Sequence, residues 1–450
     1  MSGLSTFATV AFLLSLLLLQ SFAAKIGYFW HITDIHSQWF YKAGSDPTKG
    51  CQAGTGDAGS YGDFHCGTPD ILTSSALKFM QSRLPDPDFL LYTGDIMPHL
   101  KVMKYVVHDE DTLIDATRNF TKLVSAYFPS THFVPVFGNH DVEPNAHQWC
   151  EDRSSIYRRT LEIFRSHIPI SQDKTFLKGG YFEICPSEKF CLLMLNTNPY
   201  FFFDKKAGEI DDPLNQFDYL EKALVDYRQR DVKIVIATHV PIGVNPNDPY
   251  ITGMWPKHHD RLMHLVRDNA DIIQAYLAGH EHSDSFRLVV NQEGSSFPVL
   301  VSPAILVEAH DVGKIGYFGN NPGVRLYSYD KESGELLDYE QYWMNLTLSN
   351  EKQLDVWSLE YRASSFFRVK NLSGNQMQLA LRHLIDEPEL FQQYWTYQNV
   401  LKPKPRIGKV ASRVHLCGMK YIDLVDVYLC HFGKKICKKL FIFEFKLFIF

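Results

Sequence analysis

Five short segments of the chain carry side chains that bind divalent metal ions. Their candidate residues are Asp34, His36, Asp95, Asn139, His140, His239, His280 and His282. Carboxylate and amide oxygens suit hard divalent cations, and imidazole nitrogen extends the choice to zinc and other transition metals. The spacing patterns are Asp-x-His, Gly-Asp, Gly-Asn-His-Asp, a single histidine and Gly-His-x-His. Together these segments predict a metal centre.

Two metal ions at one site would support the hydrolysis of phosphate esters. A carboxylate can bind both ions, because it offers an oxygen to each and offsets their mutual repulsion. Two cations about 3.5–4 Å apart neutralise the charge that develops on phosphate and supply hydroxide near neutral pH. A His-x-His pair alone is more often structural than metal-binding. The ordered set of five segments is far more specific, and it predicts phosphoester hydrolysis.

Each of the five segments follows a short apolar run that is rich in β-branched residues. These runs cover residues 26–33, 89–93, 133–137, 232–238 and 272–278. Continuous apolar runs of this length are typical of strands that are buried on both faces. Apolar residues at helical spacing occur in residues 68–82, 111–127, 215–229 and 259–269. The alternation predicts an α/β fold whose strand ends deliver polar residues to one crevice.

The chain has 450 residues, and its pattern changes after residue 338. Beyond that point the sequence predicts a hairpin edge followed by helices, without further strand-plus-histidine segments. We therefore expect a catalytic domain over residues 24–350 and a helical C-terminal region over residues 351–450. Residues 440–450 are apolar but too short and too charged to span a bilayer. A poorly packed, irregular tail is favoured there over an edge strand or a membrane contact.

The first residues have the features of a secretory leader. Residues 7–19 are apolar, and small residues precede a cleavage site after Ala23, although a basic N-terminal region is missing. This apolar run is shorter than the roughly 20 residues that span a bilayer, so a signal peptide over residues 1–23 is favoured over a membrane anchor. Sequons that predict surface glycans lie at Asn119, Asn345 and Asn371. We expect a secreted, extracellular or lysosomal glycoprotein without a transmembrane anchor.

Charge and cysteine content agree with this expectation. The net charge of −6 provides no basic field for a nucleic-acid backbone, so a nucleic-acid polymer is not an expected partner. The eight cysteines suit disulfides in a secreted protein. Cys51 and Cys66 bracket a glycine-rich loop, and a disulfide that closes this loop is the favoured interpretation. Cys185 and Cys191 could bridge a hairpin, and the remaining pairings stay open.

These motifs resemble those of the calcineurin-like metallophosphoesterase superfamily over residues 26–350. Four further segments resemble one family within it, the acid sphingomyelinase-like phosphodiesterases. They lie at residues 93–99, 212–217, 239–243 and 320–325. The resemblance implies a β-sandwich flanked by helices, with a small helical C-terminal region. Acid sphingomyelinases themselves carry a saposin domain before the first metal motif. Asp34 follows the expected cleavage site too closely to leave room for one.

The resemblance also implies a role for each candidate residue. One metal would be held by Asp34, His36 and His282, the other by Asn139, His239 and His280, with Asp95 as the bridge. His140 would stabilise the phosphoryl oxygens. His99 would give a proton to the leaving group, a role that suits imidazole because it titrates near neutral pH. Hydroxide between two divalent ions, for which zinc is the expected identity, would attack phosphorus in line.

We therefore expect a secreted phosphodiesterase that hydrolyses phosphoester or phosphoanhydride bonds, with soluble nucleotide-type substrates favoured. Sphingomyelin, cleaved to phosphocholine and ceramide, is the alternative substrate. An inactive extracellular binding protein on the same scaffold is a second alternative. A purple acid phosphatase is disfavoured, because the segment after Asp95 lacks the tyrosine that binds ferric iron in those enzymes.

Overall fold

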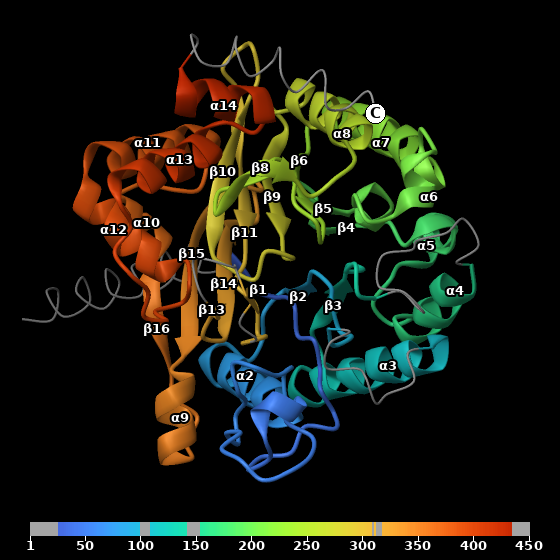
Figure 1. Cartoon of the computed structure of the whole chain (residues 1–450). Coiled ribbons are helices and arrows are strands. Elements are labelled where there is room, and N and C mark those ends of the chain that lie inside the picture. The colour runs from blue at the N-terminus through green and yellow to red at the C-terminus, as the bar shows by residue number, and fades with distance from the viewer. Residues whose placement is uncertain (1–25, 100–108, 142–153, 308–309, 312–316, 434–450) are drawn as a thin grey trace, which may run out of the picture.

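The computed structural model describes residues 26–99, 109–141, 154–307, 310–311 and 317–433 (Figure 1). The expected signal peptide and the apolar tail at residues 440–450 lie outside the described residues. Two six-stranded sheets pack face to face, and helices cover their outer surfaces. The prediction of an α/β sandwich flanked by helices is confirmed.

The first sheet has the strand order β16-β15-β14-β1-β2-β3. Its strands are β1 (Ile26–Ile32), β2 (Phe89–Tyr92), β3 (His132–Pro135), β14 (Gly323–Asp330), β15 (Leu336–Met344) and β16 (Trp357–Arg362). Strands β1, β2 and β3 are parallel, whereas β14 is antiparallel to β1. The three strands that precede the first three metal-binding segments are therefore neighbours, and their C-terminal ends lie at one edge.

The second sheet has the strand order β10-β11-β9-β6-β5-β4. Its strands are β4 (Phe182–Ser187), β5 (Phe190–Met194), β6 (Lys233–Ala237), β9 (Ile273–Ala278), β10 (Ser285–Val290) and β11 (Ser296–Val301). Strands β5, β6, β9 and β11 are parallel. Along β5, Leu192 and Met194 belong to the central core, while Cys191 and Leu193 belong to the core on the outer face. Burial on both faces explains why the run is continuously apolar.

Helices cover the two outer faces of the sandwich. On the first sheet, Phe79 of α2 (Asp70–Arg83) packs on Trp30 and Phe120 of α3 (Glu110–Tyr127) packs on Phe133. On the second sheet, α7 (Gln216–Gln229) and α8 (Pro256–Asp268) supply apolar residues to the outer core. The four predicted helices are thus present with small shifts at their ends. The chain between β3 and β6 also forms α4 (Ser154–Ile163), α5 (Asp173–Gly179) and α6 (Lys205–Gly208), of which α4 packs on α3 and on α5.

The C-terminal region packs against the sandwich rather than standing apart from it. Its helices are α9 (Leu346–Lys352), α10 (Ala363–Phe367), α11 (Gly374–Asp386), α12 (Pro388–Tyr397), α13 (Lys409–Lys420) and α14 (Leu424–Phe432). The rings of Phe367 and Tyr394 lie 5.4 and 5.9 Å from the ring of Phe286 in β10. Strand β16 pairs with β15, so the first sheet extends past residue 350. A domain boundary near that residue stays a prediction.

Two hairpins and three disulfides complete the described structure. The hairpins pair β7 (Val244–Asn245) with β8 (Asp248–Thr252), and β12 (His310–Asp311) with β13 (Tyr317–Phe318). The disulfides join Cys51 to Cys66, Cys185 to Cys191 and Cys417 to Cys430. The other two cysteines lie outside the described residues. Over the described ranges, no helix is both long and apolar enough to cross a membrane.

The three sequons differ in their surroundings. Asn119 is exposed on α3. Asn345 is the N-cap of α9, where its Oδ1 accepts a hydrogen bond from the backbone N–H of Leu348 at 3.0 Å. Asn371 donates from Nδ2 to Glu335 Oε1 at 2.6 Å, and a glycan on this nitrogen would alter that contact. Glycosylation of all three residues stays a prediction.

Candidate metal centre

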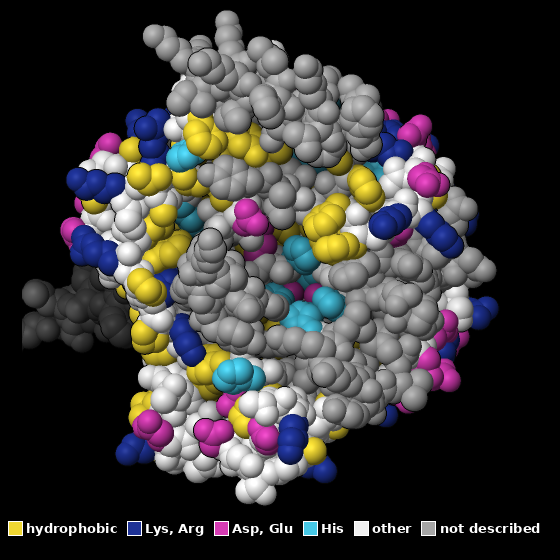
Figure 2. Space-filling view, in the orientation of Figure 1, with side chains coloured by type: hydrophobic (Ala, Val, Ile, Leu, Met, Phe, Trp, Pro, Cys, Tyr) yellow, Lys and Arg dark blue, Asp and Glu magenta, His cyan; other side chains and the backbone are white. Residues whose placement is uncertain are grey.

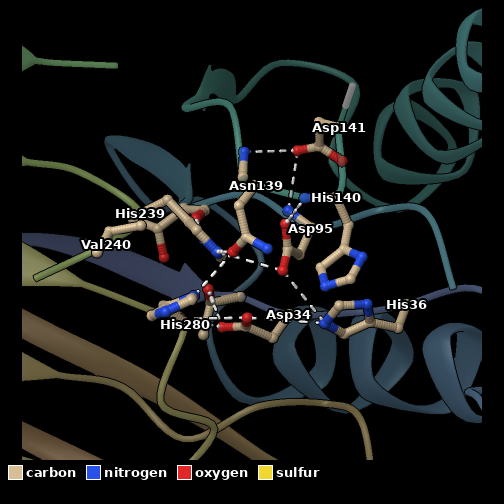
Figure 3. A network of polar contacts seen from close by, with 12 residues as sticks. Asp34, His36, Asp95, Asn139, His140, Asp141, His239, Val240 and His280 are labelled. Atoms are coloured by element: carbon tan, nitrogen blue, oxygen red, sulfur yellow. Dashed lines mark hydrogen bonds and ion pairs between the residues drawn. The ribbon is translucent and has the colours of Figure 1, made fainter. Parts of the chain in front are cut away.

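The five predicted metal-binding segments meet at one edge of the sandwich (Figure 3). Strand β1 leads into Asp34 and His36, strand β2 into Asp95, and strand β3 into Asn139 and His140. Strand β6 leads into His239, and strand β9 leads into His280 and His282. Figure 2 shows histidines (cyan) in a hollow of the surface, with acidic atoms (magenta) between them. Each sheet thus contributes part of one cluster.

The backbone turns sharply at these strand ends. Asp34, His36, Asp95, His280 and His282 have φ values between 44° and 71°. A left-handed backbone costs about 1–3 kcal/mol at a non-glycine residue, and it persists where surrounding contacts enforce it. Such contacts are present, because the backbone N–H groups of Asp34 and His36 donate to the carbonyls of Gly94 and Asp95 at 3.0 and 2.9 Å.

Two glycines of the motifs are required by the close approach of two turns. Gly94 has a φ of 98°, and a Cβ on it would lie 2.4 Å from the backbone nitrogen of Gly138. A Cβ on Gly138 would lie 2.1 Å from Asp95 Oδ1. Only glycine allows this approach, which brings the turn after β3 against the turn after β2.

The first candidate ligand set surrounds Asp34. Its Oδ1 lies 3.8 Å from His36 Nε2 and 3.3 Å from His282 Nε2. Asp34 and His36 are fully buried, and the carboxylate also accepts hydrogen bonds from Thr33 Oγ1 at 2.6 Å and from the backbone N–H of His280 at 2.9 Å. These contacts hold the carboxylate in one orientation toward the two imidazoles.

The second candidate set surrounds Asn139. Its Oδ1 lies 2.9 Å from His239 Nε2 and 2.8 Å from His280 Nδ1. Asp95 lies between the two sets, because its Oδ2 is 3.4 Å from His36 Nε2 and 3.2 Å from His239 Nε2. The carboxylate of Asp95 therefore faces one member of each set.

Hydrogen bonds select the tautomers that present a lone pair to the cluster. His36 Nδ1 donates to Met97 O at 2.8 Å, and His239 Nδ1 donates to Thr93 O at 2.7 Å. In each ring Nε2 is then the atom that can bind a metal, as is usual for zinc-binding histidines. His36 Nε2 is buried and makes no hydrogen bond in the described structure. A buried nitrogen of this kind, facing two carboxylates, fits a cation.

The electrostatics of the cluster favour ionised carboxylates. Burial alone would raise the pKa of Asp34 and of Asp95, but the facing histidines outweigh burial and hold both pKa values well below the ordinary range. His239 is also buried, yet Asp95 raises its pKa to about 9, so a metal ion that binds Nε2 would displace a proton. Burial and the neighbouring His239 lower the pKa of His280 to about 3, which keeps that imidazole neutral. Two carboxylates next to a neutral imidazole are suited to a divalent cation.

His99 and His140 lie beside the first set. The ring centroid of His99 is 4.1 Å from that of His36, 5.6 Å from that of His282 and 4.8 Å from that of His140. His36, His99 and His282 could also form a metal-binding group, because one nitrogen of each lies within 4.8 Å of the others. The roles of His99 as a proton donor and of His140 at the phosphoryl oxygens stay predictions.

Asp141, for which the sequence motifs predicted no role, is buried behind the cluster. Its Oδ2 accepts hydrogen bonds from the backbone N–H groups of Gly138 and Asp95 at 2.7 and 2.9 Å, and its Oδ1 accepts one from Ile96 at 2.7 Å. Burial and the nearby Asp95 raise the pKa of Asp141 to about 6. The signal in the sequence was its place as the last residue of Gly-Asn-His-Asp.

Two asparagines outside the five metal-binding segments also hold the turns of those segments. Asn198 is buried and donates from Nδ2 to the carbonyls of Phe137 and Gly138 at 2.9 and 3.0 Å. Asn320 donates from Nδ2 to the carbonyl of His282, and Asn399 donates to Asn320 Oδ1 at 2.8 Å. Through the latter pair, the C-terminal region contacts a ligand turn. No periodicity in the sequence pointed to these contacts.

Comparison with known proteins gives the family of the chain. The family profile for calcineurin-like phosphoesterase matches residues 27–284, which is more than half of the chain. The profile for the acid sphingomyelin phosphodiesterase C-terminal region matches residues 298–435. The chain belongs to the acid sphingomyelinase-like phosphodiesterases. They form part of the calcineurin-like metallophosphoesterase superfamily, so this chain is a metal-dependent phosphodiesterase.

Relatives of this phosphodiesterase match nearly its whole length. Cyclic GMP-AMP phosphodiesterase SMPDL3A of Bos taurus is 31% identical over 90% of this chain and 90% of its own. Acid sphingomyelinase-like phosphodiesterase 3b of Homo sapiens is 29% identical over the same shares of both chains, 90% and 90%. Sphingomyelinase phosphodiesterase C of Dictyostelium discoideum is 29% identical over 92% of this chain and 94% of its own.

Proposed function

We propose that the strand-end cluster binds two zinc ions and that the protein is a secreted phosphodiesterase acting on soluble nucleotide-type substrates. The position of Asp95 carries this proposal. Its Oδ2 lies 3.4 Å from His36 Nε2 in one ligand set and 3.2 Å from His239 Nε2 in the other. A carboxylate between two such sets is placed to bridge two cations.

Each ion would have its own ligands besides this bridge. One would be held by Asp34, His36 and His282, and the other by Asn139, His239 and His280. Imidazole-rich sets completed by oxygen ligands suit zinc among the divalent metals. When bound, the two ions would offset the negative charge of the phosphate group and lower the pKa of a water molecule at the site.

The protein's own side chains would then orient the substrate and move the proton. The backbone N–H of His140 donates to Asp95 Oδ1 at 2.8 Å, and the His140 ring lies 5.1 Å from that of His36. Its imidazole would donate to a phosphoryl oxygen. His99 would protonate the oxygen of the leaving group, because its ring lies at the edge of the cluster and is partly exposed. Histidine suits this step, since its ordinary pKa is near neutral pH.

The names of the relatives support ranking nucleotide-type substrates before sphingomyelin. SMPDL3A of Bos taurus and of Homo sapiens, each 31% identical to this chain, is named for hydrolysis of a cyclic dinucleotide. Sphingomyelin is the second candidate, because the Dictyostelium discoideum relative is named a sphingomyelinase. Secretion is supported by the leader-like residues 1–23 together with the three disulfides of the described structure.

A side-by-side assay tests the proposal. Purified protein is incubated with cyclic GMP-AMP, ATP or micellar sphingomyelin, with added zinc or with a chelator. We expect zinc-dependent hydrolysis that is fastest on the nucleotides. Asp95→Asn should lower kcat about a thousand-fold or more with the fold retained, because losing the bridging charge removes several kcal/mol of electrostatic stabilisation. Asp226→Asn, on the exposed face of α7, is the matched control.

The other outcomes separate the alternatives. Fastest hydrolysis of sphingomyelin would favour the second substrate. Stoichiometric zinc without hydrolysis of any phosphoester would indicate an inactive binding protein. Near wild-type turnover by Asp95→Asn with zinc bound would contradict the two-metal assignment.

A further inference from the structure

A cavity of about 250 Å³ adjoins the metal centre. Its lining residues are Phe202, Pro241, Asn245, Asp248, Gly253, His280, Glu281 and His282. His280 and His282 belong to different ligand sets, so a phosphate group bound between the sets would lie at the mouth of this cavity. Figure 2 shows hydrophobic (yellow) and acidic (magenta) atoms bordering the hollow that contains the histidines. The cavity is therefore placed to receive a group attached to that phosphate.

One wall of the cavity is aromatic. Buried Phe201 packs edge-on against His280, with 5.0 Å between ring centroids. The ring of Phe202 lies 5.1 Å from that of Phe201 and 4.2 Å from that of Phe203. The backbone N–H of Phe202 donates to Gly253 O at 3.2 Å, which ties this run to the segment after β8. Phe202 is thus a supported ring at the cavity surface, next to a metal-binding histidine.

The polar groups of the cavity disfavour a second phosphate. The described lining residues include two carboxylates and no lysine or arginine. The side chain of Glu281 is only 6% exposed and pairs with the fully buried Arg287, so its charge is compensated. Asp248 is exposed and would repel an additional phosphate. Carboxylate and amide oxygens of Asp248 and Asn245 can instead accept hydrogen bonds from amino groups.

A flat, uncharged ring with amino groups would stack on the aromatic wall and donate hydrogen bonds to the acceptor oxygens of the cavity. We propose that this cavity binds the nucleobase of the substrate, stacked on Phe202 with its amino edge toward Asp248 and Asn245. This inference rests on the proposed phosphodiesterase function and adds the part of the protein that would distinguish nucleotides from other phosphodiesters. Phe202 is then a specificity-determining residue, since stacking on an aromatic side chain stabilises any base through its π-face.

Binding of two phosphate ligands to the zinc-loaded protein tests this assignment. Adenosine 5′-monophosphate and methyl phosphate carry the same phosphate monoester group, but only the first has a base. In Phe202→Ala we expect the calorimetric Kd for adenosine 5′-monophosphate to rise about ten-fold, because one stacking contact is lost. The Kd for methyl phosphate should stay within about two-fold. Phe202→Tyr, which keeps the ring, should bind both ligands like the wild type.

Ile170→Ala is the control, because Ile170 is an apolar residue that is 78% exposed and does not line the cavity. An equal loss of both ligands in Phe202→Ala, or no loss of either, would overturn the assignment. Tighter binding of phosphocholine than of adenosine 5′-monophosphate would also overturn it, in favour of a quaternary ammonium group. Base-selective binding without hydrolysis of any phosphodiester would refute the proposed catalytic function and leave the base site standing.

Discussion

At the scale of single residues, the carboxylate of Asp141 organises the metal centre from behind. Its three hydrogen bonds join the turn after β2 to the turn after β3. The first turn contains Asp95 and the second contains Asn139, so Asp141 sets the distance between the proposed bridging residue and a proposed ligand of the second set. Residues that orient metal ligands in this way affect metal affinity without binding the metal themselves.

The variant Asp141→Asn tests this positioning role. The amide keeps the shape of the carboxylate but presents an NH₂ group to a backbone N–H, so at least one hydrogen bond to a charged acceptor is lost. We expect the free energy of unfolding to fall by about 2–3 kcal/mol and zinc affinity to fall about 10- to 100-fold. Urea denaturation and zinc titration measure the two effects. Unchanged zinc affinity, with Asp226→Asn as the control, would contradict the role.

At the scale of elements, a hydrogen bond between two buried side chains joins α13 to the end of α12. Gln398 Nε2 lies 2.8 Å from His415 Nε2, and because an amide nitrogen only donates, His415 accepts this hydrogen bond as a neutral imidazole. Burial, together with the charges of Lys404 and Arg287, lowers the pKa of His415 to about 3. This attachment matters to the site, because the backbone carbonyl of Gln398 also accepts a hydrogen bond from Asp284, two residues after His282.

The neutral state of His415 predicts a loss of stability in acid. Its ordinary pKa is 6.5, so below that pH the unfolded chain takes up a proton that the folded protein excludes. The contribution of neutral His415 to the free energy of unfolding is fully present above pH 6.5 and is lost as the pH falls toward 3. By pH 5 the loss is about 2 kcal/mol.

Urea unfolding at pH 7 and pH 5 measures this effect. The variant His415→Gln, which cannot titrate, should lose about 2 kcal/mol less than the wild type over that interval. In the wild type, the NMR chemical shifts of the His415 ring should stay constant down to about pH 4. Equal losses in both proteins, or a ring titration near pH 6.5, would contradict the prediction.

At the scale of the whole molecule, the metal centre joins the two sheets. Asp34, Asp95 and Asn139 follow strands of the first sheet, whereas His239 and His280 follow strands of the second. Metal ions held by both groups would link the sheets at the edge where their strands end. The large core between the sheets is built from both, as the 4.4 Å stacking of Phe190 on Tyr329 shows. The apo protein should therefore remain folded but be less stable.

Metal removal tests this link. A ligand that binds only the native state adds about 4 kcal/mol to the free energy of unfolding when its free concentration is a thousand-fold above its Kd. We expect a chelator to lower Tm by about 5 °C or more, and added zinc to restore it. Differential scanning fluorimetry measures the shift, and Asp95→Asn should show a smaller one. An identical Tm with and without zinc in the wild type would contradict binding across the two sheets.

The sequence by itself determined the five strands of the metal-binding segments, the four helices between them and the residue types at the strand ends. Their signals are local: apolar runs buried on both faces, helical spacing, and glycine beside the metal-binding types. The family followed from the order of those motifs. The disulfide between Cys51 and Cys66 was also expected, because the two cysteines bracket a loop that no strand or helix would order.

Only the tertiary structure decided how these pieces combine. The distribution of β1–β3 and of β5, β6 and β9 between two sheets depends on which apolar faces pack together, and no local pattern encodes that choice. Asp141, Asn198 and Asn320 act through hydrogen bonds to backbone groups that become neighbours only in the fold. Phe202 lines the same cavity as His280 because its segment pairs with the one after β8 in the fold. Contacts between segments that are remote in sequence therefore orient the residues of the site and form the cavity beside it.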